Sequence, residues 1–172
     1  MTEKSNIPII SFIAKSGSGK TTLLEKVIRQ LKSDGYRIAV IKHDAHRFDM
    51  DKPGKDSWRI AEAGADVVAI SSPGKVAMIE KVNNEKSLEE VIDLLPDVDL
   101  ILTEGFKQSG KPAIEVSRSE VHRDLLPEPV NRLAIASDVY WDIGVPCYDI
   151  NDASGIVSEI KKYVAGLKKA KH

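Results

Sequence analysis

The sequence predicts an α/β fold, in which a mostly parallel sheet carries helices on both faces and an antiparallel hairpin at its edge. The first observation is that apolar runs of strand length alternate with segments whose apolar residues recur at helical spacing. The second is that several runs are apolar throughout, as in strands that are buried on both faces. With 172 residues, 42% of them hydrophobic, the chain suits one domain, and we expect residues 1–172 to form it.

The first elements along the chain are clearly marked. Residues 7–13 form a solid apolar run, as expected for a covered strand. The apolar residues from Leu23 to Leu31 then recur at helical spacing, and Gly35 supplies a stop signal for that helix. Residues 37–41 give the second strand.

A short helix and a hairpin follow. The expected helix at 57–63 is closed by Gly64 and leads into a strand at 66–70. The Ser-Pro-Gly-Lys sequence at 72–75 has turn chemistry, so the next apolar run, 76–82, is expected to pair with that strand. This pairing gives the predicted antiparallel hairpin.

The remaining elements restore the strand and helix alternation. Ser87 and Glu90 form a capping box, which predicts a helix that continues to Leu95. A closing amphipathic helix covers 156–167. Three further apolar runs are expected as strands, at 98–103, 113–116 and 133–136. Two long polar segments, 43–56 and 105–132, are of the kind that usually carries function in a compact domain.

The composition excludes several classes of protein. A net charge of -1, from 25 basic and 26 acidic residues, argues against nucleic-acid binding, which usually needs a basic excess. The single cysteine, Cys147, cannot form an internal disulfide and is expected to be a reduced thiol. No apolar run reaches the ~20 residues of a membrane span, and the polar start lacks the pattern of a signal peptide. We therefore expect a cytoplasmic protein without a membrane partner.

The strongest functional signal follows the first strand. Residues 14–21 read Ala-Lys-Ser-Gly-Ser-Gly-Lys-Thr and match the phosphate-binding P-loop, or Walker A, pattern GxxxxGK[ST] except at Ala14. Glycines there allow backbone N–H groups to turn toward phosphate oxygens, and the following helix points its positive end at the same anion. The sequence thus predicts a P-loop NTPase-like fold, against the alternative of a simple glycine- and serine-rich turn. The residues expected to contact a nucleotide are Ser16, Gly17, Ser18, Gly19, Lys20, Thr21 and Thr22.

Individual roles follow from the chemistry of that loop. Lys20 is expected to reach the β- and γ-phosphates, and the Thr21 hydroxyl to ligate Mg²⁺. Lys15 gives a second pattern, KxGxGKT, which resembles the deviant Walker A of dimeric P-loop proteins, where an early lysine reaches the partner's nucleotide. Ser16 replaces a glycine of that pattern, and an exposed lysine without a special role is the alternative. Because the loop contains no arginine, we expect slow hydrolysis.

Acidic residues at the carboxyl ends of strands are candidate metal ligands, because ligands bind beyond those ends in an open α/β sheet. Glu104 directly follows the strand 98–103, whereas Asp99 lies near its start, and five residues at ~3.3 Å each separate them by ~16 Å. We choose Glu104 as the Walker-B-like acid. Asp44 follows the second strand and is expected to hold Mg²⁺ through water or to orient the attacking water. The candidate catalytic set is Lys15, Lys20, Asp44 and Glu104, and the metal set is Thr21, Asp44 and Glu104.

Two further groups leave alternatives open. Asp138 follows the strand 133–136, where its carboxylate could accept both N–H groups of a guanine edge or could cap a turn. A transition-metal cluster is a weaker hypothesis because the two histidines stand three apart without a CxxC or HExxH motif. Its candidate ligands are His43, His46, Asp49 and Asp51.

Taken together, these residues resemble the molybdopterin-guanine dinucleotide biosynthesis protein B (MobB) family. The resemblance is carried by GSGKTTL at 17–23, IKHDAH at 41–46, GKDSWR at 54–59, AGA at 63–65, SSP at 71–73, LTEGFK at 102–107 and IEVSR at 114–118. It implies a homodimer that binds GTP with Mg²⁺, hydrolyses it weakly and assists the enzyme that attaches GMP to molybdopterin. Molybdopterin itself is a further candidate ligand. The resemblance places phosphate roles on Gly17, Gly19, Lys20 and Thr21, and metal-side roles on Asp44 and Glu104.

Three rival functions remain on the sequence alone. A small-molecule kinase would need an arginine-rich lid, and the segment 105–132 contains Arg118, Arg123 and Arg132. A GTP-dependent metallochaperone would need a cysteine-containing metal motif, which the lone Cys147 disfavours. A non-catalytic adaptor would use the nucleotide only to set its shape.

Overall fold

The computed structural model describes residues 7–44, 48–127 and 130–170. The chain divides into two compact units, the first made of residues 1–43 and 92–172 and the second of residues 44–91. No described helix has both the length and the apolar character needed to cross a membrane.

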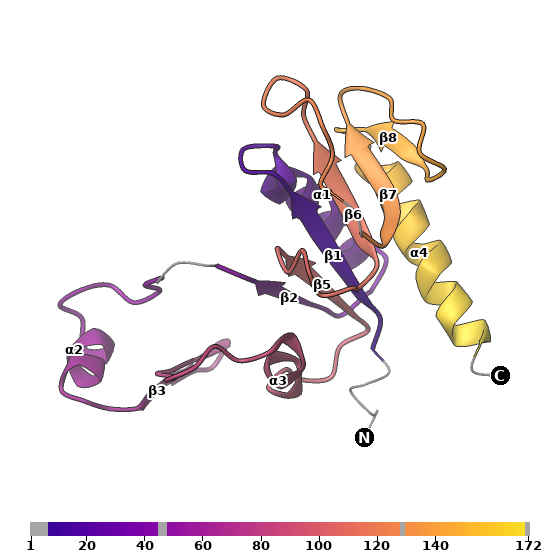
Figure 1. The fold of residues 1–172 in the computed structure, drawn as a ribbon. Helices are drawn as coiled ribbons and strands as arrows, with labels where there is room; N and C mark the ends of the chain where they lie inside the picture. The colour runs from indigo at the N-terminus through magenta and orange to yellow at the C-terminus, as the bar shows by residue number, and fades with distance from the viewer. Residues whose placement is uncertain (1–6, 45–47, 128–129, 171–172) are drawn as a thin grey trace. The chain divides into compact units, whose positions relative to one another are not determined.

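The first unit is built on a six-stranded sheet (Figure 1). Its order is β2-β5-β1-β6-β7-β8, and every neighbouring pair is parallel, as the solid apolar runs predict. Because β1 lies between β5 and β6, the ends of those two strands flank the point where β1 stops. The strands are β1 (Ile9–Ala14), β2 (Ile38–Lys42), β5 (Leu100–Glu104), β6 (Ala113–Ser117), β7 (Arg132–Ser137) and β8 (Cys147–Asp149).

Two amphipathic helices, α1 (Lys20–Ser33) and α4 (Ala153–Lys169), pack against each other on one face of this sheet. Their buried side chains and every second residue of the central strands form one core. Burying each large aliphatic side chain contributes roughly 1.5–3 kcal/mol. The helical part of this core consists of Leu23, Leu24, Val27 and Leu31 from α1, and Ile156, Val157, Ile160 and Val164 from α4.

The long polar segment after β5 contacts the face of the sheet opposite the α1–α4 core. Ser11 and Glu115 point away from the α1–α4 core because strand side chains alternate. The Ser11 hydroxyl lies 3.5 Å from that of Ser109, and the Leu126 N–H donates to the Glu115 carboxylate at 2.6 Å. This segment is therefore packed against the sheet.

The edge strand β8 is not predicted from the sequence. It has only three residues and follows Pro146, which marks a strand edge or start rather than an interior position. The Pro146 carbonyl accepts from the N–H of Ile135 at 2.9 Å and so begins the pairing with β7. Its apolar pattern is too short to show periodicity.

The second unit contains α2 (Asp56–Glu62), a hairpin of β3 (Val67–Ser72) and β4 (Lys75–Glu80), and the start of α3 (Leu88–Asp93). The predicted hairpin is confirmed, with Ser72 opposite Lys75. It forms a separate two-stranded sheet rather than the edge of the larger one. The predicted capping box is also present, because the Ser87 N–H donates to the Glu90 carboxylate at 2.8 Å and the Glu90 N–H donates to the Ser87 hydroxyl at 3.2 Å.

Candidate functional site

The phosphate loop joins the end of β1 to the start of α1. Gly17 and Gly19 have φ values of 79° and 85°, in the left-handed region that side chains disfavour. The Ser18 hydroxyl is buried and donates to the Lys15 carbonyl at 3.0 Å, which closes the turn. No side chain caps α1, and its first turn contains no acidic residue. The positive end of the helix therefore faces the loop without a competing carboxylate on the helix itself.

The structure brings Lys20, Thr21 and Glu104 together. β5 pairs with β1 so that Glu104 lies opposite Phe12, two residues before the loop begins. The Thr21 hydroxyl donates to Glu104 Oε1 at 2.8 Å, and Lys20 Nζ lies 3.5 Å from the same oxygen. A hydroxyl and a carboxylate at this distance are oxygen donors of the kind Mg²⁺ prefers, so these residues fit that ion.

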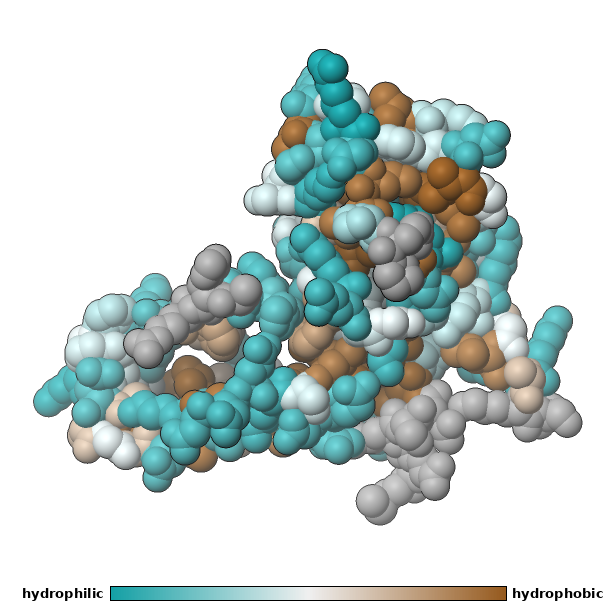
Figure 2. Space-filling view, in the orientation of Figure 1, coloured by the Kyte–Doolittle hydropathy of each residue, from teal (hydrophilic) through white to brown (hydrophobic). Residues whose placement is uncertain are grey.

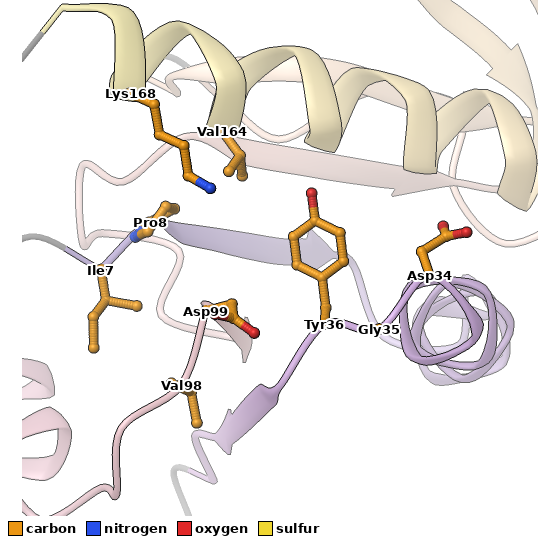
Figure 3. Close-up of a pocket in the computed structure, with 9 residues that line it drawn as sticks. All are labelled: Ile7, Pro8, Asp34, Gly35, Tyr36, Val98, Asp99, Val164 and Lys168. Atoms are coloured by element: carbon orange, nitrogen blue, oxygen red, sulfur yellow. The ribbon is translucent and has the colours of Figure 1, made fainter. Parts of the chain in front are cut away.

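Asp99 lies at the opposite end of β5. Its carboxylate accepts from the Arg37 N–H at 2.7 Å and so holds the start of β2. It also lines a pocket whose other residues precede β1 and β5 or end α1 and α4 (Figure 3). Figure 3 shows Tyr36, Val164 and Lys168 among them. None of the candidate site residues lines this pocket, which separates it from the phosphate loop.

Lys15 is held within its own chain. Its ammonium group forms an ion pair with Asp124, and its side chain is 23% exposed. The hydrogen bond from Lys15 lowers the pKa of the Asp124 carboxyl. Lys15 is thus not a simply exposed lysine, and reaching a partner's nucleotide would require it to leave Asp124.

Residues 118–124, which we call the covering segment, follow β6 and run along the phosphate loop. A β-carbon added to Gly19 would lie 3.4 Å from Arg118 Nη2. The sequence shows no periodic signal for this arrangement, and only the length and polarity of the segment pointed to a function. The neighbours run in opposite order along the two segments: Arg118 beside Gly19, Val121 beside Gly17, His122 bonded to the Ser16 carbonyl, and Asp124 paired with Lys15.

Asp138 anchors the start of the covering segment. Its two carboxylate oxygens accept from the Ser119 N–H at 2.8 Å and from the Ser119 hydroxyl at 2.9 Å. The bond from the backbone N–H is the main cause that lowers the pKa of Asp138. This is the turn-capping role, one of the two alternatives that the sequence suggests for Asp138. A guanine edge would have to share or replace the two hydrogen bonds from Ser119. The structure carries no observation that places guanine here, so that role stays a prediction.

Asp138→Asn separates the two roles. If Asp138 binds guanine, the preference for GTP over ATP should fall roughly 10–100-fold, the effect of losing hydrogen bonds to a charged group, while phosphate binding persists. Paired titrations with GTP and ATP measure this ratio. Ser119→Ala is the matched control, because it removes one partner of Asp138 and leaves the carboxylate. Retained selectivity in Asp138→Asn, or an equal loss in both variants, would assign Asp138 to holding the covering segment.

The structure describes Asp44 and the candidate transition-metal ligands only in part. Asp44 begins the second unit, so its predicted role toward Mg²⁺ stays a prediction. The His43 N–H donates to the Glu104 carbonyl at 2.9 Å, and its ring packs on Phe106. His46 lies outside the described residues, and within the described ones no group of three or more His, Cys, Asp or Glu could hold a metal ion.

Phe106 adds a feature that sequence reasoning missed. Its φ of 51° is the only positive value at a described residue other than glycine. Gly105 before it has a φ of 98°, so the chain turns sharply directly after Glu104. This turn places the Phe106 ring beside His43, and no local sequence signal predicts it.

The three arginines suggested for a kinase lid have different environments. Arg132 pairs with Glu115 at 2.6 Å, and their side chains are only 4% and 2% exposed. Arg132 Nη2 also donates to the Leu126 carbonyl at 2.6 Å. It therefore holds Leu126 beside Glu115 and is not available to a lid. Arg118 lies beside the phosphate loop, and Arg123 is exposed.

A parallel sheet with a glycine loop between β1 and α1, and with Glu104 beside that loop, defines a protein of the P-loop NTPase-like class. The family model for molybdopterin guanine dinucleotide synthesis protein B (MobB) matches residues 9–138. The chain belongs to the MobB family, as the sequence motifs predicted.

Relatives and solved structures agree with this assignment. The chain is 37% identical to a molybdopterin-guanine dinucleotide biosynthesis adapter protein of Escherichia coli K12, over 95% of this chain and 97% of the relative. It is 36% identical to the protein of the same name from Haemophilus influenzae, with coverages of 93% and 91%. The crystal structure of Bacillus subtilis MobB has a TM-score of 0.74 at 27% identity, covering 89% and 98%. A second, of molybdopterin-guanine biosynthesis protein B, has a TM-score of 0.70 at 31% identity, covering 91% and 99%.

Proposed function

We propose that this chain is a GTP-binding adapter in the synthesis of molybdopterin guanine dinucleotide. In this role it assists a partner enzyme that transfers GMP to molybdopterin, and it hydrolyses GTP weakly with Mg²⁺. The observation that carries the nucleotide part is the convergence of Lys20, Thr21 and Glu104 at the start of α1. The pathway part is supported by the names of relatives that match nearly the whole chain.

The chain's own groups suggest how the nucleotide would be held. The uncapped start of α1 and the ammonium group of Lys20 would neutralise the phosphates. Thr21 and Glu104 would hold Mg²⁺, which supplies further charge neutralisation when bound. Slow hydrolysis fits the pairing of Lys15 with Asp124, because that cation is not free to act on a nucleotide until the pair breaks.

A nucleotide titration tests the proposal. We expect GTP to bind with Mg²⁺, to bind more tightly than ATP, and to be hydrolysed slowly. The same titration with molybdopterin present tests whether the pterin is a second ligand. Failure of GTP to bind the folded protein would overturn the proposed function, and rapid transfer of phosphate to a small molecule would favour the kinase instead.

The other rival functions gain no specific support. The kinase hypothesis is weakened because Arg132, one of the three arginines suggested for a lid, forms a buried ion pair with Glu115. The metallochaperone hypothesis gains no support, because the described part of the chain holds no cluster of three or more His, Cys, Asp or Glu, and Cys147 is its free cysteine. A non-catalytic adaptor, in which the nucleotide only sets the shape of the protein, differs from our proposal only in lacking hydrolysis. A cytoplasmic location remains part of the proposal.

A homodimer is also part of the proposal, and the hairpin of the second unit supports it. An isolated two-stranded sheet is marginal in water. Here both of its faces expose large apolar side chains: Val67, Val76 and Met78 on one, Ile70 and Ile79 on the other. Figure 2 shows apolar surface among polar side chains where α2 and β3 lie in Figure 1. Such a surface is typical of an interface.

Replacing Val76 and Met78 by lysine should therefore produce a monomer. Two charges in an apolar interface would have to be desolvated without partners, which opposes association. Sedimentation velocity of the double variant against the unmodified chain measures the change. Tyr140→Lys is the control, because Tyr140 is exposed in the first unit. A dimer that survives the double substitution would move the interface elsewhere, and a monomeric unmodified chain would overturn the dimer.

A further inference from the structure

Two consecutive polar groups lie unpartnered beside the phosphate loop. Within the described residues, Ser117 Oγ and Arg118 Nε are buried and have no hydrogen-bond partner. Ser117 is the last residue of β6, the strand that pairs with β1 up to Ala14, and Arg118 directly follows it. Folded proteins satisfy nearly all buried donors, so an unsatisfied pair at this place requires an explanation.

The Arg118 guanidinium lies against the loop itself. Its Nη2 is 3.4 Å from where a β-carbon of Gly19 would be, and Gly19 directly precedes Lys20. Arg118 forms no ion pair with any described carboxylate. Its charge lowers the pKa of Asp138, but only as the last of several causes. A partly buried guanidinium without an anionic partner is costly, and an arriving anion would compensate it.

The backbone around Arg118 is fixed from several sides. Its carbonyl accepts from the N–H groups of Val121 at 3.0 Å and of His122 at 2.9 Å. The next residue, Ser119, is held by both oxygens of Asp138. The backbone that carries the guanidinium therefore already forms a turn before a ligand binds, which reduces the entropy lost on binding.

We propose that Arg118 is a phosphate-binding residue, supplied by the covering segment of the same chain to a polyphosphate held in the loop. The proposal rests on the proposed function, which places a nucleotide there. The planar guanidinium forms two parallel hydrogen bonds to phosphate oxygens, which a lysine cannot do. Arg118 would thus add a second cation to that of Lys20. A phosphate oxygen would also give the unsatisfied Arg118 Nε a hydrogen-bond partner.

Arg118→Met tests this, because methionine keeps an apolar stem of similar packing and removes the charge. Isothermal titration with GTP and with inorganic tripolyphosphate should show affinities roughly 10–100-fold weaker for both, the effect of losing hydrogen bonds between charged groups. Arg118→Lys should recover part of the loss. Arg123→Met is the matched control, because Arg123 is an exposed arginine of the same segment, and it should bind both ligands as the unmodified chain does.

Chemical rescue separates a direct contact from loop packing. Millimolar guanidinium should restore GTP affinity to Arg118→Ala and not to Lys20→Ala, whose lost group is an ammonium. Unchanged affinity in Arg118→Met would overturn the inference, as would a loss for GTP without a loss for tripolyphosphate. If Arg118→Met does not fold, full GTP affinity in Arg118→Lys would overturn the inference instead. Failure of the unmodified chain to bind GTP would instead refute the proposed function, so the two failures are distinct.

Discussion

Replacing Lys20 by alanine is expected to lower GTP affinity by roughly 100-fold or more, the effect of truncating one partner of a desolvated charge pair. Lys20 Nζ lies 3.5 Å from Glu104 and belongs to the first turn of α1. Removal of the ammonium would leave the Glu104 carboxylate to repel an incoming phosphate. The fold should persist, because Thr21 still donates to that carboxylate.

Isothermal titration with GTP and Mg²⁺ measures the loss, and thermal unfolding checks that the variant is folded. Lys32→Ala is the matched control: Lys32 is an exposed lysine in the last turn of the same helix and donates to the Tyr36 carbonyl. It should leave GTP affinity unchanged. A folded Lys20→Ala variant with full GTP affinity would contradict the assignment of residues 14–21 to phosphate binding.

The part of the site that follows from strand ends could be predicted from the sequence. A parallel sheet brings the carboxyl ends of its strands to one edge, so the position of Glu104 after an apolar run sufficed to place it near the loop. Asp99, near the start of the same apolar run, was expected at the other end of the strand, where its carboxylate accepts from the Arg37 N–H. The capping box of Ser87 and Glu90 was likewise readable, because it depends on residues only three apart.

The covering segment could not be predicted, because its contacts depend on tertiary packing between residues about a hundred positions apart. Nothing local indicates that Asp124 pairs with Lys15 or that Arg118 lies beside Gly19. From the sequence, Arg118 was only one of the arginines suggested for a lid, and the loop itself contains no arginine, whereas in the structure Arg118 of the covering segment lies beside Gly19. The separate sheet of the hairpin was missed for the same reason, since local pairing does not fix which sheet a hairpin joins.

Glu104→Gln should weaken the dependence of GTP binding on Mg²⁺. Glutamine keeps the shape of the side chain and one oxygen that can accept from Thr21, but it removes the negative charge that a metal ion needs. The gain in GTP affinity produced by Mg²⁺ should fall roughly 10–100-fold, as when a group that supports a metal site is lost. Without Mg²⁺ the variant should bind GTP at least as tightly as the unmodified chain, because one repelling carboxylate is gone.

Titrations in Mg²⁺ and in a chelator, run on Glu104→Gln and Asp99→Asn side by side, test this ranking. Asp99→Asn alters a carboxylate on the same segment of chain but at the amino end of β5, so it should leave the Mg²⁺ effect intact. A larger effect for Asp99→Asn would place the metal near the pocket of Figure 3, where α1 and α4 end. Helix carboxyl ends carry partial negative charge and repel phosphates, so that outcome would separate the metal from the nucleotide and remove the basis for hydrolysis at the loop.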